Sequence, residues 1–105
     1  MRKKYGYRED LIKRLKNPKY ATQYLNAALG DSDRHVFLLA LRDVVEAHGG
    51  MSNFSRRAKI PRISLYRMLS KSGNPEIKSL ENILKPMGLG LIVTDLESIN
   101  LRKAA

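Results

Sequence analysis

Apolar residues recur at steps of three and four along most of this chain, which is the spacing of helices that bury one face. In the stretch 18–29 the apolar positions are Tyr20, Tyr24, Leu25, Ala28 and Leu29. Before them, Asn17 is a suitable N-cap, and Pro18 suits the first helical position because its missing N–H is not needed there. Gly30 can end the helix. The pattern therefore predicts an amphipathic helix over these residues.

A second helix is predicted over residues 34–48, where the pattern is the most apolar of the chain. Residues 36–41 are apolar on nearly all sides, so we expect this helix to be central and buried. The Asp-Ser-Asp run at 31–33 offers capping side chains, and the Gly-Gly pair at 49–50 ends the pattern. His48 lies in the last turn, where a positive charge interacts favourably with the helix dipole.

Two short helical patterns follow, separated by a tight turn. The residues predicted to face the core are Phe54, Ser55, Ala58, Ile60, Leu65, Met68 and Leu69. Small residues on the first helix allow the second to cross it closely, and Ser52 is a candidate cap for the first. This spacing predicts a helix-turn-helix over residues 51–70, with the second helix free on its outer face.

The C-terminal part of the chain predicts one more helix and one strand. Apolar positions continue over residues 77–87, and Pro86 should end or kink this helix because its ring removes a hydrogen bond and crowds the preceding turn. Residues 91–94 then read as a strand that has no second strand in the chain to pair with. A lone strand usually pairs with a copy of itself, so we expect a homodimer. The residues expected to form its two-stranded ribbon are Leu91, Ile92 and Val93.

The fold class expected from these elements is all-α, a five-helix helix-turn-helix domain with one short C-terminal strand for dimerisation. A chain of 105 residues is a single-domain candidate. The expected divisions are a basic N-terminal arm at 1–16, a DNA-binding domain at 17–94 with its dimerisation strand at 89–94, and a tail at 95–105. Within the arm, Leu11, Ile12 and Leu15 predict only a short amphipathic turn or two.

The distribution of charge points to a polyanionic partner. The formal net charge is +10, and residues 51–75 carry six bases and no acid. Residues 1–20 carry eight bases and two acids, whereas residues 21–50 carry two bases and four acids. Two separated basic blocks favour double-stranded nucleic acid, because each neutralised phosphate releases counterions. The simpler alternative is a generally basic surface.

The outer face of the second motif helix supplies the candidate DNA contacts. With Leu65, Met68 and Leu69 turned inward, Arg62, Ile63 and Arg67 are the candidates for base contacts. An arginine can pair bidentately with guanine, and an isoleucine can meet a thymine methyl group. The candidates for phosphate contacts are Ser52, Asn53, Arg56, Arg57, Tyr66, Ser70 and Lys71. For Arg56 and Arg57, simple solvation remains an equal alternative.

Four stretches together resemble a known family. They are LKNPKYATQYLNAAL, FLLALRDVVEAHGGMS, SLYRMLSKSGNP and LKPMGLGLIV. They look like the probable addiction-module antidote proteins, HigA-like antitoxins with an XRE-type, lambda-repressor-like helix-turn-helix. The resemblance covers about residues 9–94, and its most specific pieces are 24–29 and the Ser-Leu-Tyr…Gly-Asn-Pro run. It implies a repressor, often of prophage origin, that binds its own promoter and neutralises a RelE/HigB-like toxin by direct contact.

The chain departs from this family pattern at three points. Lys59 stands where the family usually has a residue tolerant of positive φ, and a left-handed lysine costs roughly 1–2 kcal/mol. Pro61 replaces the usual capping Ser, and it pushes Ile60 toward extended geometry. The third departure is the net charge, because RelE-like toxins are commonly basic and a +10 antidote would repel one.

The sequence disfavours several other classes of protein. It contains no Cys, no His pair at metal-ligand spacing and no glycine-rich phosphate loop, so we expect neither an enzyme nor a cofactor, metal or small-molecule substrate. No apolar run suggests a signal peptide or a membrane span, and the cytoplasm is the expected compartment. Two alternatives stay open, a stand-alone phage-type regulator and, less favoured, a basic RNA- or ribosome-associated protein.

Overall fold

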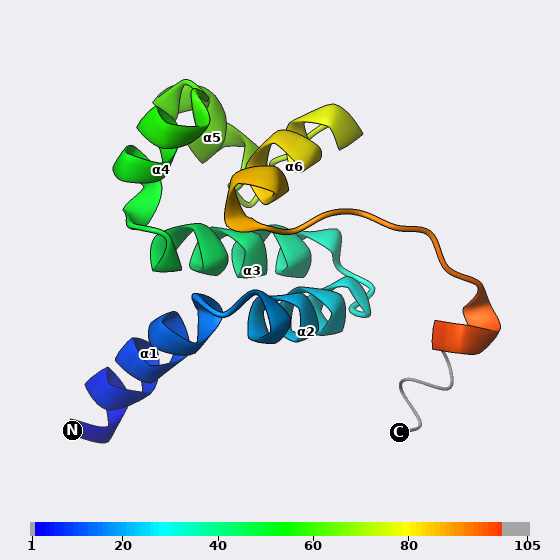
Figure 1. The fold of residues 1–105 in the computed structure, drawn as a ribbon, viewed down its shortest axis with the longest axis horizontal. Helices are drawn as coiled ribbons and strands as arrows, with labels where there is room; N and C mark the ends of the chain where they lie inside the picture. The colour runs from blue at the N-terminus through cyan, green and yellow to red at the C-terminus, as the bar shows by residue number, and fades with distance from the viewer. Residues whose placement is uncertain (1, 100–105) are drawn as a thin grey trace.

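The computed structural model describes residues 2–99, with side chains from residue 6 onward, and these residues form helices and connecting segments with no strand (Figure 1). The elements are α1 (Arg2–Leu15), α2 (Pro18–Leu29), α3 (Arg34–Ala47), α4 (Gly50–Ala58), α5 (Arg62–Met68), α6 (Ile77–Leu84) and the 3-10 helix η1 (Lys85–Met87). The all-α prediction is confirmed. The count of five helices is wrong, because the described residues contain six α-helices and one 3-10 helix.

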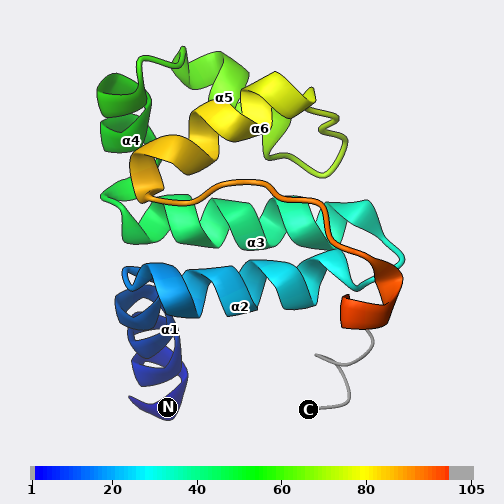
Figure 2. The ribbon, with the colours of Figure 1, turned by 45° about the vertical axis from the view of Figure 1, so that its right-hand side comes forward.

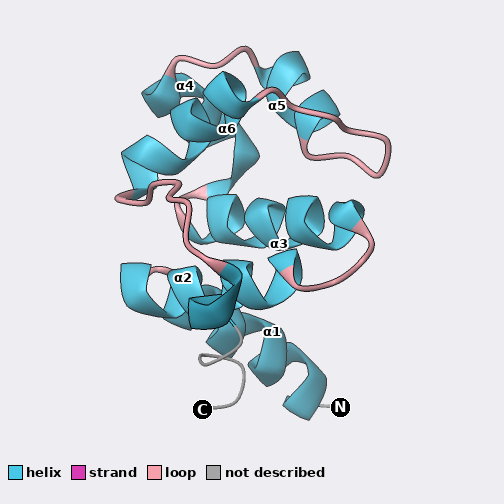
Figure 3. Cartoon of the chain, turned by 90° about the vertical axis from the view of Figure 1, so that its right-hand side faces the viewer, coloured by secondary structure: helices cyan, strands magenta, loops and turns pink. Residues whose placement is uncertain are grey.

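Helix α3 lies in the middle of the molecule. Figure 2 shows α2 running antiparallel to α3 on one side, with α4, α5 and α6 on the other side, and Figure 3 shows the same layering from another direction. The buried residues of α3 are Phe37, Leu38, Ala40, Leu41, Val44, Val45 and Ala47. They join one core with residues from every other helix, as the apolar run at 36–41 predicted.

The helix starts predicted before α2 and α3 are confirmed. The Asn17 side chain accepts a hydrogen bond from the Lys19 backbone N–H at 2.9 Å, and Pro18 occupies the first helical position. The Asp33 side chain caps α3 by accepting from the His35 N–H at 2.9 Å. Both caps satisfy backbone donors that have no partner inside the helix.

The N-terminal stretch forms a longer helix than the one or two turns expected from its sequence. Helix α1 packs against α3, and Leu15 at its end is fully buried. The Arg8 guanidinium lies 3.0 Å from the Asp43 carboxylate on α3, and the Tyr24 hydroxyl of α2 donates to the same carboxylate at 2.7 Å. Burial and this hydrogen bond raise the pKa of Tyr24 to about 12. Asp43 on α3 therefore links α1 and α2 to α3 through this ion pair and this hydrogen bond.

Helix α6 ends as its proline predicts. Its last residue is Leu84, and the chain then tightens into η1, which contains Pro86. Gly88 follows with a φ of 77°, a left-handed conformation that glycine adopts without strain. The Leu89 N–H reaches back to the Leu84 carbonyl at 3.1 Å, which closes this end of α6.

The predicted strand is not present in the single chain. Residues 89–95 cross the molecule as a coil without ladder hydrogen bonds (Figure 2), and residues 96–99 form a short helical turn. The ribbon predicted for Leu91, Ile92 and Val93 stays a prediction, because a strand needs a neighbour to pair with and the described residues of one chain offer none. Of the predicted tail, residues 100–105 lie outside the described part of the structure.

Candidate nucleic-acid interface

Helices α4 and α5 form two short helices joined by a tight turn, at the place where the sequence predicted a helix-turn-helix. Phe54 of α4, Leu65 of α5 and Leu69 at the end of α5 are all fully buried. Ser55 is also buried, and its hydroxyl donates to the Ile60 carbonyl at 2.5 Å across the turn. A small residue is needed at this position because the two backbones approach closely.

The turn has the strained geometry that its sequence predicted. Lys59 has φ 59° and ψ 40°, which is the left-handed conformation, and it is the sole non-glycine residue with positive φ in the described part of the chain. Pro61 occupies the N-cap position of α5 and provides no side-chain cap. The Pro61 carbonyl still accepts a hydrogen bond from the Leu65 N–H at 3.0 Å. The first backbone hydrogen bond of α5 therefore forms without a side-chain cap.

The outward face of α5 presents the three residues predicted for base contacts. The Ile63 side chain is 73% exposed, which is unusual for an isoleucine beside a well-packed core. Arg62 and Arg67 are exposed as well. The structure thus places these three side chains in solvent while it buries Leu65 and Leu69 on the opposite side, as the helical period requires.

Two arginines lie near the Tyr66 ring, and the sequence pattern did not predict one of them, Arg42. The Arg62 guanidinium carbon is 5.6 Å from the Tyr66 ring centroid, and that of Arg42 is 5.3 Å from it. Arg42 comes from α3, outside the two motif helices. Its one sequence signal is that it is the sole base in residues 35–55, in the middle of an apolar helix. Helical periodicity alone does not place it beside α5.

Several predicted phosphate contacts on α4 are held by local hydrogen bonds. The Asn53 amide donates to the Gly49 carbonyl at 2.9 Å, and its oxygen accepts from the Arg56 guanidinium. The Arg57 guanidinium donates to the His48 carbonyl at 2.6 Å, which covers the end of α3. These bonds orient the two arginines, and the choice between a phosphate contact and simple solvation stays open for both.

Predicted roles for Ser52 and His48 need correction. Ser52 does not cap α4, because the helix begins at Gly50 and its N-cap is Gly49, which has φ 100° and no side chain. His48 does not favour a positive charge, because burial, followed by the charges of Arg57 and Lys16, lowers its pKa. The dipole of α3 is outweighed by these two effects.

The remaining phosphate candidates lie where α5 ends. The Ser70 hydroxyl donates to the Arg67 carbonyl at 2.8 Å, and Lys71 follows in the exposed turn. Gly73 then passes so close to α5 that a Cβ atom on it would lie 2.1 Å from the Met68 carbonyl oxygen. The Gly-Asn-Pro run therefore closes the end of α5 by backbone contact, and a larger residue at 73 has no room.

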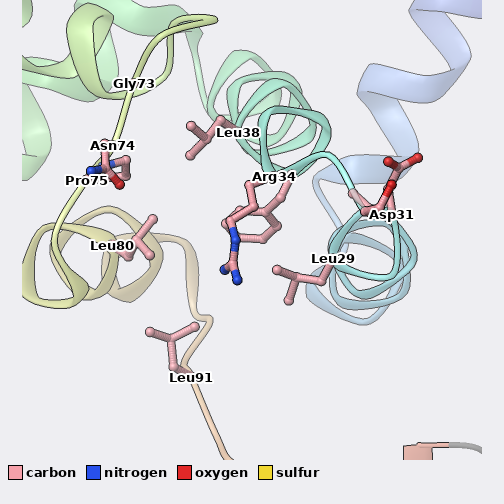
Figure 4. Close-up of a pocket in the computed structure, with 12 residues that line it drawn as sticks. Leu29, Asp31, Arg34, Leu38, Gly73, Asn74, Pro75, Leu80 and Leu91 are labelled. Carbon is pink, nitrogen blue, oxygen red and sulfur yellow. The ribbon is translucent and has the colours of Figure 1, made fainter.

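A hollow of about 420 Å³ lies on another part of the surface, beside residues 73–75 and the start of α3 (Figure 4). Its walls are mostly apolar, with Leu29, Leu38 and Leu80 around the opening and the Arg34 side chain extending into it. Leu91 of the C-terminal coil forms part of the same wall. The apolar lining thus continues into the exposed segment that follows Leu91.

Two other features, a metal-ion cluster and a membrane-spanning helix, are absent from residues 2–99. No group of three or more His, Asp or Glu side chains lies close enough to hold a metal ion in this part of the chain. Within the same range, none of the helices has the length and apolar character needed to cross a bilayer.

Comparison with known proteins places the chain in a family. Residues 7–95 match the model of the family described as "Probable addiction module antidote protein". An uncharacterized protein of Haemophilus influenzae (strain Rd) is 32% identical over 80 residues, which cover 76% of this chain and 81% of that protein. No solved structure matches the chain. Because the family model spans most of its length, the chain belongs to the probable addiction module antidote proteins.

Proposed function

We propose that this protein is a cytoplasmic, DNA-binding antitoxin of a type II toxin-antitoxin module and that it represses transcription of its own operon. The observation that carries DNA binding is the geometry of α5. Its inner residues Leu65 and Leu69 are fully buried, while Arg62, Ile63 and Arg67 stand in solvent on a helix that follows a tight turn. Membership of an antidote family supports the antitoxin role.

In this proposal α5 is an XRE-type recognition helix that enters the major groove. Arg67 and Arg62 pair with guanine edges, and Ile63 meets a thymine methyl group. Sequence-independent affinity comes from backbone contacts around the groove. The residues proposed for these contacts are Ser52, Asn53, Arg56, Arg57, Tyr66, Ser70 and Lys71.

A homodimer would let two copies of α5 read a palindromic operator with half-sites about 34 Å apart. The apolar C-terminal segment supports this, since the Ile92 side chain is 83% exposed and that of Val93 is 99% exposed. The backbone of residues 91–94 has no ladder partner within the described chain, so it can pair with a second copy. Leu91 also lines the apolar hollow, which extends the apolar surface beside this segment.

The dimer is tested by Val93→Asp, measured by light scattering at micromolar concentration. We expect the wild type to have the mass of a dimer and the variant that of a monomer, since a charge in a paired apolar ribbon is desolvated. Asn82→Asp, at an exposed position of α6 outside the segment, is a control for added charge. A monomeric wild type would exclude this dimer.

DNA binding is tested by fluorescence anisotropy on the DNA upstream of the gene, with a scrambled duplex for comparison. The wild type should prefer the upstream DNA, and its affinity should fall steeply with salt. Arg67→Ala should lose about 1–3 kcal/mol of binding free energy and relax the preference at one base position. Equal affinity of the wild type for both duplexes would reject sequence-specific binding.

The proposed partner is a RelE/HigB-like toxin, and the surface proposed for it is residues 11–29, which lie away from α5. The structure places α1 and α2 across α3 from the two motif helices (Figure 2). A toxin could therefore bind there without covering the recognition helix. Coexpression with the neighbouring gene and affinity purification tests this, and the two proteins should elute together.

A stand-alone phage-type regulator is the second candidate, and the net charge favours it. A +10 chain repels a basic toxin, whereas it attracts any DNA. Failure to co-purify with the neighbouring gene product, together with retained operator binding, would favour this alternative.

A further inference from the structure

We propose that Arg42 of α3 is an additional contact to the DNA backbone, and that Tyr66 is the positioning residue that holds it beside the recognition helix. The inference rests on the proposed DNA binding and adds to it a residue from outside the two motif helices. It also gives Tyr66 a role through its ring in addition to its hydroxyl group.

The position of Arg42 is the first support. Its guanidinium carbon lies 5.3 Å from the Tyr66 ring centroid, which is within the range of a cation–π interaction. Tyr66 belongs to α5 and is itself partly exposed. An arginine of the central helix is therefore carried across to the side of the molecule that bears Ile63, Arg62 and Arg67.

The charges around Tyr66 are the second support. Arg62 approaches the same ring at 5.6 Å, so two positive groups converge on one aromatic side chain. Within residues 6–99, neither guanidinium forms an ion pair with a carboxylate. Asp43, the neighbour of Arg42 in sequence, is occupied by Arg8 and Tyr24 on the other side of α3. Two positive groups beside one ring, with no carboxylate paired to either of them, form a surface suited to an anion.

The class of anion follows from what surrounds this pair. Arg62 is the first residue of α5, whose exposed face is proposed to enter the major groove. The sugar-phosphate backbones of the two DNA strands border that groove on both sides. A phosphate diester meets the planar guanidinium of Arg42 at this border. The Tyr66 ring limits the rotamers of both arginines, so less side-chain entropy is lost when they bind.

The experiment compares Arg42→Gln with Arg14→Gln on the upstream duplex and on a scrambled duplex, over 50–200 mM salt. Arg14 is the matched control, because it is an arginine 6.0 Å from a tyrosine ring, that of Tyr20, on the α1–α2 side of the molecule. Arg42→Gln should reduce the slope of log affinity against log salt by about 0.9 and leave the base preference unchanged. Arg14→Gln should leave the slope unchanged.

Two variants of Tyr66 separate the ring from the hydroxyl group. Tyr66→Phe keeps the ring and should keep the contribution of Arg42, so adding Arg42→Gln to it should again reduce the slope by about 0.9. In Tyr66→Leu the same addition should reduce the slope by much less. Circular dichroism melting verifies that each variant is folded before binding is measured. If Arg42→Gln reduced the slope as much in the Tyr66→Leu background as in the Tyr66→Phe background, the positioning role of Tyr66 would be rejected.

The outcomes distinguish this inference from the proposed function. A wild type that prefers the upstream duplex, with equal slopes for wild type and Arg42→Gln, would overturn the Arg42 contact alone. Equal losses for Arg42→Gln and Arg14→Gln would reduce the effect to net charge and would also overturn it. A wild type without preference for the upstream duplex would reject the proposed function instead.

Discussion

The outer face of α5 and the C-terminal segment, residues 89–96, are both exposed, but they present opposite chemistry. Helix α5 shows arginines around a tyrosine, with Ile63 as its one large exposed aliphatic residue, and it is anchored by the fully buried Leu65. The segment shows aliphatic side chains such as Ile92 and Val93, and its backbone has no ladder partner. A charged face on a rigid helix suits a polyanion, whereas an apolar face on an extended segment suits another protein chain.

The two surfaces also differ in what they contribute to the folded monomer. Unfolding of α5 would expose part of the core, because Leu65 on its inner face is fully buried there. The segment after Leu91 buries little, so the monomer gains little from it. In the proposed dimer, these apolar side chains would be buried against a second chain.

The largest expected effect tests this difference in anchoring. Leu65→Ala removes a fully buried side chain and should lower the free energy of unfolding by about 2–5 kcal/mol. Val93→Ala removes a fully exposed one and should change it by less than about 0.5 kcal/mol at concentrations where the protein is monomeric. Urea denaturation of both variants measures the two effects. Similar losses for both would show that the segment is part of the core.

A smaller effect is expected at the turn before α5. Lys59→Gly relieves the left-handed strain and should raise the free energy of unfolding by up to about 1 kcal/mol. Lys85→Gly, in the right-handed conformation at the start of η1, is the matched control and should lower it. Urea midpoints compare the two variants. A loss of stability in Lys59→Gly would mean that the lysine side chain contributes more than its conformation costs.

The smallest effects are in the pH dependence of stability, and the pH range should differ between His48, at the end of α3, and Asp95, in the C-terminal segment. The pKa of His48 is lowered from 6.5, first by burial and then by Arg57 and Lys16, so the unfolded chain takes up the proton first as pH falls. The contribution of His48 to the free energy of unfolding is therefore fully present above pH 6.5 and decreases below that pH. The pKa of Asp95 is lowered from 3.8 by hydrogen bonds from Ser98, so its contribution decreases only below pH 3.8.

The measurement for this prediction is the urea midpoint between pH 7.5 and pH 5.5. The wild type should lose stability over this range, and His48→Gln should lose less of it. Asp95→Asn should shift the midpoint by an amount that stays constant over this range, because the contribution of Asp95 changes only in stronger acid. An unchanged pH profile in His48→Gln would show that His48 is solvated equally in both states.

Local chemistry made much of the fold predictable from sequence. The caps at Asn17 and Asp33, the end of α6 before Pro86 and the left-handed Lys59 each follow from one residue and its neighbours. The inner face of α5 follows from the period of Leu65, Met68 and Leu69. The base and phosphate roles of the candidate residues stay predictions until DNA binding is measured.

What the sequence did not reveal depends on contacts between distant parts of the chain. The length of α1 is supported by the pairing of Arg8 with Asp43, which has no local signature. It is also supported by the burial of Leu15, whose apolar pattern predicted only a turn or two. The pairing of Arg42 with Tyr66 also joins two helices. A strand at 91–94 needs a partner chain, which local propensity cannot supply. The pKa of His48 is lowered first by burial and then by bases in α4 and in the turn after α1.

The close passage of Gly73 over the end of α5 has a consequence for how this protein can evolve. Because the Met68 carbonyl oxygen fills the space that any Cβ would need, each single-base change that replaces this glycine should be selected against. Asn74, one residue later, is exposed and carries no such constraint. A saturation mutagenesis library under selection for function should therefore show glycine alone at position 73, next to a tolerant position 74. In the proposed role, new operator preferences would arise through the exposed face of α5, while the backbone closure behind it stays fixed.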